Sequence, residues 1–327
     1  MDRRFYLATG DTEDGADARD AVADVLPPGW IVVDEPDDVT AILAVDVDVD
    51  AELVKRAGGA LRVLATIGPE VDEAAAAAAG ARVLALPSDS QLSRLSVAEY
   101  SVTLMLMLVH NMLAITRSAA GPWAPDRQTP IHTNQTTYVY NWPAIQGSGF
   151  LRGRVVGIVG AGTIGAASAK LLAPFGVRLL YTQRHRLPAA DEQRLGLEWR
   201  EFDDLLRESD IISLCHRLQE GPGGNEGQFG SREFALMKPT AILINTARGR
   251  VIDEDALVTA LRNGQIGGAG LDVFHYEPLP PGHPLLSLAG DNVIISPHIA
   301  SGTENEYWRY AFRAVTDACG SGADARV

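Results

Sequence analysis

The segment from Leu151 to Gly165 reads LRGRVVGIVGAGTIG, and an alanine- and leucine-rich stretch follows it as far as Phe175. The apolar run before Gly160 is typical of a buried parallel strand, and the stretch after Gly165 predicts a helix. In the GxGxxG turn between them, the first glycine permits a tight turn and the second lets the backbone approach a pyrophosphate. The third lets the helix pack on the strand. A strand, glycine turn and helix in this order predict a dinucleotide-binding fold with the pyrophosphate at the helix N-terminus.

The strand expected next, Val177–Tyr181, ends in Thr182-Gln183-Arg184-His185-Arg186. An NAD site commonly carries Asp or Glu about twenty residues beyond the glycines, where it binds the ribose 2′-hydroxyl. No carboxylate occurs here before Asp191. A neutral Gln183 followed by Arg184 and Arg186 would attract a 2′-phosphate, although a solvated basic loop is the plainer interpretation. The segment therefore favours NADP(H) over NAD(H).

Three further apolar runs each end shortly before a residue with catalytic chemistry. AILIN precedes Arg248, GAGLDVF precedes Glu277, and NVIIS precedes His298. Residues just beyond the carboxyl ends of strands converge on one crevice of an open α/β sheet. An arginine can clamp a carboxylate through two hydrogen bonds, and a histidine beside a glutamate is an oriented proton donor and acceptor. The three residues together indicate a site for a small carboxylate substrate in a reaction that moves a proton.

Composition narrows the classes of partner. The chain of 327 residues has a formal net charge of −14, which argues against nucleic acid or an anionic membrane surface. Its two cysteines, Cys215 and Cys319, fit neither a disulfide framework nor a zinc site, so we expect a reducing, cytoplasmic environment and no metal. The N-terminus shows no secretory signal, and the apolar run Val97–Leu113 is interrupted by polar residues, which favours a buried helix over a membrane span.

Two Rossmann-like, doubly wound α/β domains are expected, a discontinuous substrate domain (1–96 and 301–327) and an inserted dinucleotide-binding domain (97–300). Ser96–Arg117 predicts one long helix that Ser96 caps in a capping box with Glu99. Residues 121–149 lack periodicity and are rich in aromatics, which indicates a functional or interaction arm. The expected strands of the first domain are Phe5–Ala8, Trp30–Val33, Ala41–Val45, Arg62–Thr66 and Arg82–Leu86. Those of the second begin near Val155, Val177, Ile211, Ala241, Ala269 and Val293.

Four ordered motifs resemble the D-isomer-specific 2-hydroxyacid dehydrogenase family over nearly the whole chain. They are GAGTIG at 160–165, NTARGRVIDEDAL at 245–257, GLDVFHYEP at 270–278 and SPHIASGT at 296–303. The TQRHR segment is similar to the NADPH-preferring glyoxylate/hydroxypyruvate reductase branch. The resemblance implies D-stereospecific hydride transfer between NADP(H) and C2 of a small 2-keto or 2-hydroxy acid.

The resemblance also implies roles for single residues. Arg248 would bind the carboxylate and carbonyl of a 2-keto acid, His298 would give a proton to the carbonyl oxygen, and Glu277 would hydrogen-bond that histidine. Asp272 would contact the nicotinamide amide. The remaining cofactor-binding positions are Gly160, Gly162, Thr163, Ile164, Gly165, Gln183, Arg184, His185, Arg186, Cys215, Arg217, Thr246, Ala247 and Ala300, together with Arg248 and His298. Substrate-binding positions are Ile67, Gly68 and Trp142, together with Arg248 and His298.

Three departures from the family pattern concern the substrate and the surroundings of the cofactor. The substrate loop is shortened to Ile67–Asp72, CHRLQ replaces a Pro-Leu-Thr turn ahead of the glycine-rich segment 221–230, and the aromatic arm has no close counterpart. Within that arm, Trp142 has two interpretations, a packed arm at the interface of a homodimer or a substrate contact. Two functions remain open, a 2-keto acid reductase and a dinucleotide-sensing, corepressor-like protein on the same scaffold.

Overall fold

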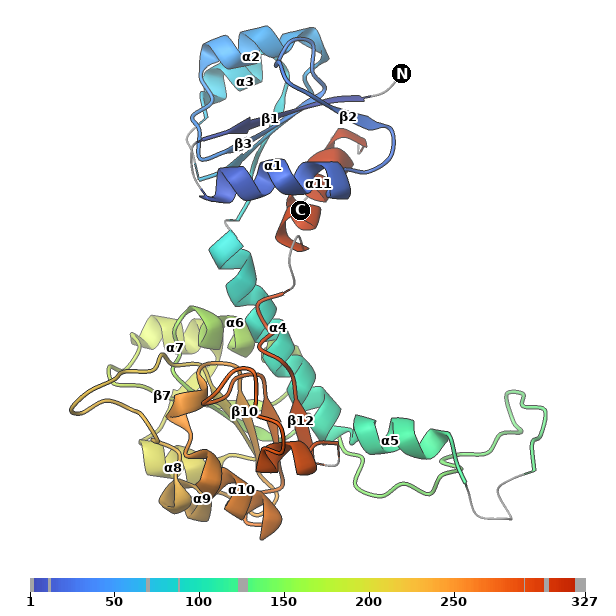
Figure 1. Cartoon of the computed structure of the whole chain (residues 1–327), viewed down its shortest axis with the longest axis vertical. Coiled ribbons are helices and arrows are strands. Elements are labelled where there is room, and N and C mark those ends of the chain that lie inside the picture. Colours follow the sequence, from blue (N-terminus) through green and yellow to red (C-terminus); the bar gives the residue numbers. More distant parts are fainter. Residues whose placement is uncertain are drawn as a thin grey trace. The chain divides into compact units, whose positions relative to one another are not determined.

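The computed structural model describes residues 3–10, 13–68, 71–87, 89–122, 129–290, 292–302 and 306–320. The chain divides into two compact units, Met1–Ser93 with Gly302–Val327, and Arg94–Ser301. Each unit contains a parallel sheet with helices on both faces (Figure 1). The predicted α/β class with two Rossmann-like units is confirmed.

The sheet of the first unit has five parallel strands in the order β2-β1-β3-β4-β5. These are β1 (Arg3–Thr9), β2 (Trp30–Val33), β3 (Ala41–Val45), β4 (Val63–Ile67) and β5 (Arg82–Ala85). The helices of this unit are α1 (Glu13–Val25), α2 (Ala51–Ala57), α3 (Glu73–Ala78) and α11 (Glu306–Gly320).

Every residue of β3 and β4 is buried, as in a parallel sheet covered on both faces. Side chains such as Phe5 and Leu43 pack with α1 and with Phe312 of α11 on one face. Ile42 and Leu64 pack against α2 on the other face, because successive strand residues point to opposite sides. The C-terminal helix therefore completes the core of the N-terminal sheet.

The second unit contains a seven-stranded parallel sheet in the order β12-β11-β10-β9-β6-β7-β8. The strands are β6 (Val155–Val159), β7 (Arg178–Thr182), β8 (Leu197–Trp199), β9 (Ile211–Leu214), β10 (Ile242–Asn245), β11 (Gly268–Leu271) and β12 (Val293–Ile295). The helices are α4 (Asp89–Val109), which starts in the last residues of the first unit, α5 (Met112–Ala119), α6 (Thr163–Leu172), α7 (Ala189–Leu195), α8 (Phe202–Glu208), α9 (Ser231–Leu236) and α10 (Glu254–Arg262).

Two hydrophobic clusters cover the faces of this sheet. Helices α4, α6 and α7 pack on one face, and α8, α9 and α10 pack on the other. By length and composition, Leu92–Val109 of α4 could cross a membrane. Leu104 and Met105 of that window are, however, buried against the sheet, which is the environment of a core helix.

The long helix expected from Ser96 to Arg117 is wrong at both ends. The Ser- and Asp-rich stretch before Ser96 holds earlier residues that can begin a helix, and α4 starts at Asp89. Ser96 therefore lies inside α4 and caps nothing; its Oγ donates to the carbonyl of Ala300 at 2.9 Å. The helix ends at Val109, because Asn111 adopts a left-handed conformation (φ 55°) that no α-helix continues through. The short strand β8 was not predicted from the sequence.

Candidate functional site

The glycine turn after β6 has the geometry of a dinucleotide cradle. Gly160 has φ +96°, and a Cβ there would lie 2.8 Å from Cβ of His216. A Cβ on Gly165 would lie 2.2 Å from the carbonyl oxygen of Gly160, so only glycine lets α6 pack this closely. A Cβ on Gly162 would meet no described atom within 4 Å, which leaves space for a phosphate beside the backbone.

The N-terminus of α6 faces the same turn. Its N-cap is Gly162, and among the described residues no side chain caps the helix. The first amides, of Thr163 and Ile164, thus have no side-chain acceptor, and the helix dipole favours an anion at this end. The residues present fit the pyrophosphate of a dinucleotide.

Two arginines after β7 have different surroundings. Arg186 binds both oxygens of Glu192, with Nε and Nη2 at 2.8 and 2.9 Å, and stacks over the ring of Trp199 at 5.7 Å. The Arg186 guanidinium, with help from the Tyr181 hydroxyl, lowers the pKa of Glu192 to about 2. The charge of Arg186 is therefore balanced within the fold.

Arg184 has a neutral partner instead. Its Nη2 donates to Oε1 of Gln219 at 2.6 Å. The neighbouring Gln183 accepts the amide of Ala161 at 3.0 Å and donates to the carbonyl of His185 at 2.7 Å. The turn that carries Arg184 is thus attached to the glycine turn, where a dinucleotide would lie.

Arg248 projects from a tightly bonded turn after β10. The buried Asn245 accepts the amide of Ala247 at 3.0 Å and donates to the carbonyl of Arg248 at 2.9 Å. A Cβ on Gly249 would lie 2.0 Å from the carbonyl carbon of Phe274, so the turn after β10 packs directly on the turn after β11. Arg248 itself is exposed, as a side chain that clamps a ligand must be.

Glu277 and His298 follow the neighbouring strands β11 and β12. Oε1 of Glu277 accepts the amide of Phe274 at 2.8 Å, and Oε2 lies 2.6 Å from Nδ1 of His298. The side chains of the pair are 34% and 47% exposed, respectively. Because Nδ1 faces the carboxylate, Nε2 is the nitrogen of His298 left to meet a ligand. The strand order and the contact between the turns after β10 and β11 thus bring Arg248, Glu277 and His298 together at the carboxyl ends of neighbouring strands.

Asp272 is fully buried and serves the loop that carries His298. Its carboxylate accepts the hydroxyl of Ser296 at 2.7 Å, the amide of Ile299 at 3.0 Å and the amide of Ala300 at 2.9 Å. The expected contact of Asp272 with a nicotinamide amide stays a prediction, since three hydrogen bonds already occupy this side chain.

The other predicted residues of this unit differ in their exposure. Thr246 is buried, with its hydroxyl 2.8 Å from that of Ser101, and Ala247 is buried beside it. Burial raises the pKa of the Cys215 thiol to about 11, which keeps it protonated, and Arg217 is exposed. Trp142 lies 42% exposed on the arm.

Ile67 and Gly68 belong to the other unit, at the carboxyl end of β4. Ile67 is buried and its carbonyl accepts the amide of Asp46 at 3.1 Å, whereas Gly68 is exposed. Pro69 and Glu70 of the shortened substrate loop lie outside the described residues.

Two residues that the sequence analysis did not single out support the site, Gln219 and Asn245. Asn245 is the last residue of β10 and belongs to the same motif as Arg248. The departure CHRLQ was recognised as unusual, but nothing local indicates that its glutamine meets Arg184, 35 residues earlier.

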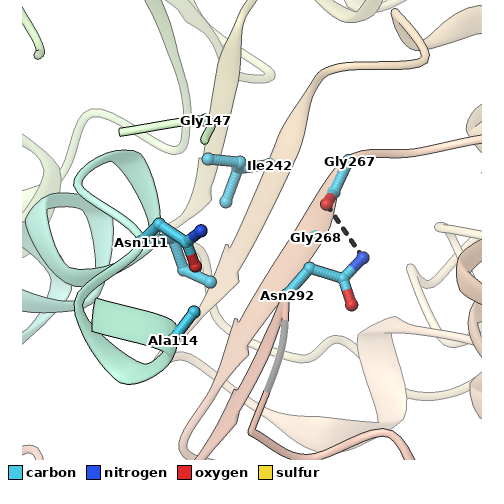
Figure 2. Close-up of a pocket in the computed structure, with 8 residues that line it drawn as sticks. Asn111, Ala114, Gly147, Ile242, Gly267, Gly268 and Asn292 are labelled. Atoms are coloured by element: carbon cyan, nitrogen blue, oxygen red, sulfur yellow. Dashed lines mark hydrogen bonds between the residues drawn. The ribbon is translucent and has the colours of Figure 1, made fainter. Parts of the chain in front are cut away.

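A pocket of about 400 Å³ lies at the amino ends of the strands of the same sheet (Figure 2). Ile242 and Gly268, the first residues of β10 and β11, line it with Asn111 and with Asn292, whose amide donates to Gly267 at 2.9 Å. It is therefore at the amino ends of the strands, whereas Arg248, Glu277 and His298 follow the carboxyl ends.

Comparison with known proteins agrees with this geometry. Residues 102–300 match the model of the D-isomer specific 2-hydroxyacid dehydrogenase NAD binding domain. The chain belongs to the D-isomer specific 2-hydroxyacid dehydrogenase family. Membership places it among NAD(P)-dependent oxidoreductases of 2-hydroxy and 2-keto acids.

A glyoxylate reductase of Thermococcus litoralis is 34% identical over 85% of this chain and 78% of that protein. One of Aeropyrum pernix is 46% identical over 50% of this chain, which is only 47% of its own length. The crystal structure of a glyoxylate reductase from Paecilomyes thermophila is 25% identical, with a TM-score of 0.54 over 98% of this chain and 94% of that one.

Proposed function

We propose that this dehydrogenase acts as an NADPH-dependent, D-specific 2-keto acid reductase in the cytoplasm. The first unit would serve as the substrate domain and the second as the dinucleotide-binding domain. The observation that carries the reaction is the 2.6 Å contact between Glu277 and His298 beside the turn of Arg248. That arrangement supplies a fixed proton donor and a carboxylate clamp at the edge where strands of this fold bind ligands.

Each residue has one task in the proposed reaction. Arg248 binds the substrate carboxylate through its guanidinium and orients the adjacent carbonyl. NADPH, when bound, supplies the hydride that adds to C2. The proton on Nε2 of His298 passes to the carbonyl oxygen, so that a 2-hydroxy acid and NADP⁺ result. Glu277 holds the ring so that Nε2 faces the substrate. The backbone amides of Ile67 and Gly68 are further candidate contacts to the substrate.

The preference for NADPH rests on Arg184. Arg186 is neutralised by Glu192, whereas the partner of Arg184 is the uncharged Gln219. A charge-assisted contact from Arg184 to the 2′-phosphate corresponds to a preference of about ten- to a hundred-fold for NADPH over NADH. Loss of this preference in Arg184→Ala would support the assignment.

The central experiment measures NADPH and NADH oxidation with a panel of 2-keto acids that includes glyoxylate, hydroxypyruvate and bulkier side chains. His298→Ala should lower kcat by roughly 10²–10⁴-fold with the best substrate, the usual effect of removing a general acid. The control is Glu52→Ala, on the exposed surface of α2 in the first unit, which should leave kcat unchanged. A His298→Ala variant with near-wild-type kcat would refute the role of His298, and a wild type that prefers NADH would refute the cofactor assignment.

We further propose a homodimer joined through the arm. Its described residues, 121–122 and 129–149, include Tyr138 and Tyr140, which are 64% and 83% exposed, and Phe150 directly after the arm is 67% exposed. Aromatic area of this size on one segment favours burial against a partner, here a second copy of the chain. The alternative of a dinucleotide-sensing, corepressor-like protein is not favoured, since a sensor needs no Glu–His pair.

A further inference from the structure

We propose that Gln219, in the loop 217–230, is a second determinant of cofactor choice that positions Arg184 for the 2′-phosphate without neutralising it. This inference rests on the proposed NADPH preference. It assigns a task to the CHRLQ segment, which replaces the usual Pro-Leu-Thr turn of the family, and to the glycine-rich segment 221–230 that follows it.

The contact itself joins two elements on different strands. Arg184 follows β7, and Gln219 follows β9, yet Nη2 of the arginine donates to Oε1 of the glutamine at 2.6 Å. Both side chains are exposed, so the hydrogen bond orients the guanidinium and adds little to the stability of the fold. Orientation before binding reduces the entropy that a phosphate contact must overcome.

The charges of the loop are arranged to suit an anion. The loop has two carboxylates, Glu220 and Glu226, and both pair with Arg250. Glu226 accepts hydrogen bonds from Nε at 3.1 Å and from Nη2 at 2.9 Å, and Glu220 accepts one from Nη1. Gln219, which accepts the hydrogen bond from Arg184, is uncharged and lies in the sequence between β9 and these two carboxylates. A carboxylate at this position would repeat the Arg186–Glu192 pair and compete with a 2′-phosphate.

The main chain of Gln219 is held firmly. Its amide donates to Oδ1 of Asn225 at 2.6 Å, its carbonyl accepts the amide of Asn225 at 3.0 Å, and Nδ2 of Asn225 donates to the carbonyl of Arg217 at 2.9 Å. Gly224 is required in this turn, because a Cβ there would lie 2.0 Å from the carbonyl oxygen of Gln219.

The far side of the loop is tied to the glycine turn. The ring of His216 bridges Oε1 of Gln228, at 3.0 Å, and the carbonyl of Val159, the last residue of β6, at 3.2 Å. These hydrogen bonds join the loop to the glycine turn. The loop therefore fixes Gln219 relative to the turn at which a dinucleotide would bind.

The test compares Gln219→Glu, Gln219→Ala and Glu220→Gln by two readouts. The first is kcat/KM for NADPH and NADH. The second is the Kd of adenosine 2′,5′-bisphosphate against 5′-AMP by calorimetry, which needs no turnover. Gln219→Ala should weaken binding of the bisphosphate about two- to ten-fold, the usual range for one hydrogen bond, and Gln219→Glu by about ten-fold or more. Binding of AMP and kcat/KM for NADH should stay within about two-fold of wild type.

The outcomes separate this inference from the proposed function. A wild type that binds both adenosine phosphates equally refutes the NADPH preference and the role of Gln219 with it. If the wild type prefers the bisphosphate and Arg184→Ala removes that preference, but both Gln219 variants behave like wild type, then only the role of Gln219 is refuted. Gln219→Ala should add no effect in the Arg184→Ala background, because it acts through that arginine. Glu220→Gln should not weaken bisphosphate binding; a loss as large as that of Gln219→Ala would show a general effect of the loop and overturn the inference.

Discussion

Asp272 supports the main chain of His298. The amide of His298 donates to the carbonyl of Asp272 at 2.8 Å, and the Asp272 carboxylate binds the amides of the two residues that follow the histidine. His298 has φ 53°, a left-handed conformation that costs a non-glycine residue about 1–3 kcal/mol. The hydrogen bonds that Asp272 accepts offset the cost of this conformation and set the direction in which the imidazole leaves the backbone.

The first prediction follows from this support. Asp272→Asn should lower kcat about ten-fold or more and reduce the free energy of unfolding by about 1–3 kcal/mol, because one backbone amide loses its acceptor. Steady-state kinetics and thermal melts test both effects. In the His298→Ala background the same change should lower stability but not the residual kcat. An equal loss of kcat in both backgrounds would show that Asp272 does not act through His298.

Substitutions at the second and third glycines of the turn, Gly162 and Gly165, should have different effects. Gly165→Ala places a methyl group 2.2 Å from the carbonyl oxygen of Gly160, so the melting temperature and the affinity for both cofactors should fall. Gly162→Ala meets no described atom within 4 Å, and its backbone (φ −74°) suits alanine. It should keep the wild-type melting temperature while raising KM for NADPH and NADH about ten-fold or more, through contact with the pyrophosphate. Unchanged cofactor KM in Gly162→Ala would argue against the cradle.

His216 should make stability depend on pH. Burial lowers the pKa of this histidine below its ordinary 6.5. The unfolded chain therefore takes up the proton first as the pH falls, and stability contributed by the neutral ring is lost below about pH 6.5. We expect the melting temperature of His216→Gln to be lower than that of wild type at pH 7.5 but to fall less between pH 7.5 and 5.5. The exposed His132 provides the control, and a fall as steep in His216→Gln as in His132→Gln would contradict the prediction.

Trp142 tests the role of the arm. If the arm of one subunit reaches the substrate site of its partner, Trp142→Ala should raise KM for keto acids with bulky apolar side chains, since a flat aromatic wall is lost. KM for glyoxylate and for NADPH should change little. Sedimentation should give a dimer for both proteins. A monomeric wild type, or an equal rise of KM for all substrates, would contradict the prediction.

Much of the fold follows from local patterns. The predicted boundaries of β2 and β3 coincide with those of the structure, because a short apolar strand leaves its signal within a few neighbouring residues. The helix boundaries around Ser96 could not be predicted in this way, since α4 gains its stability from the sheet that it covers and not from its own ends.

The sequence by itself determined the glycine cradle and placed Arg248, Glu277 and His298 just beyond three strands, because tight turns and strand periodicity are local steric constraints. The strand order β12-β11-β10, which brings these three residues together, is a property of the tertiary structure. Only the tertiary structure decided which polar side chains contact one another. In the folded chain Arg186 pairs with Glu192, Arg184 donates to the uncharged Gln219, and Asp272 holds the loop of His298. These choices depend on distances of about 3 Å between groups that can be tens of residues apart, which no local pattern encodes.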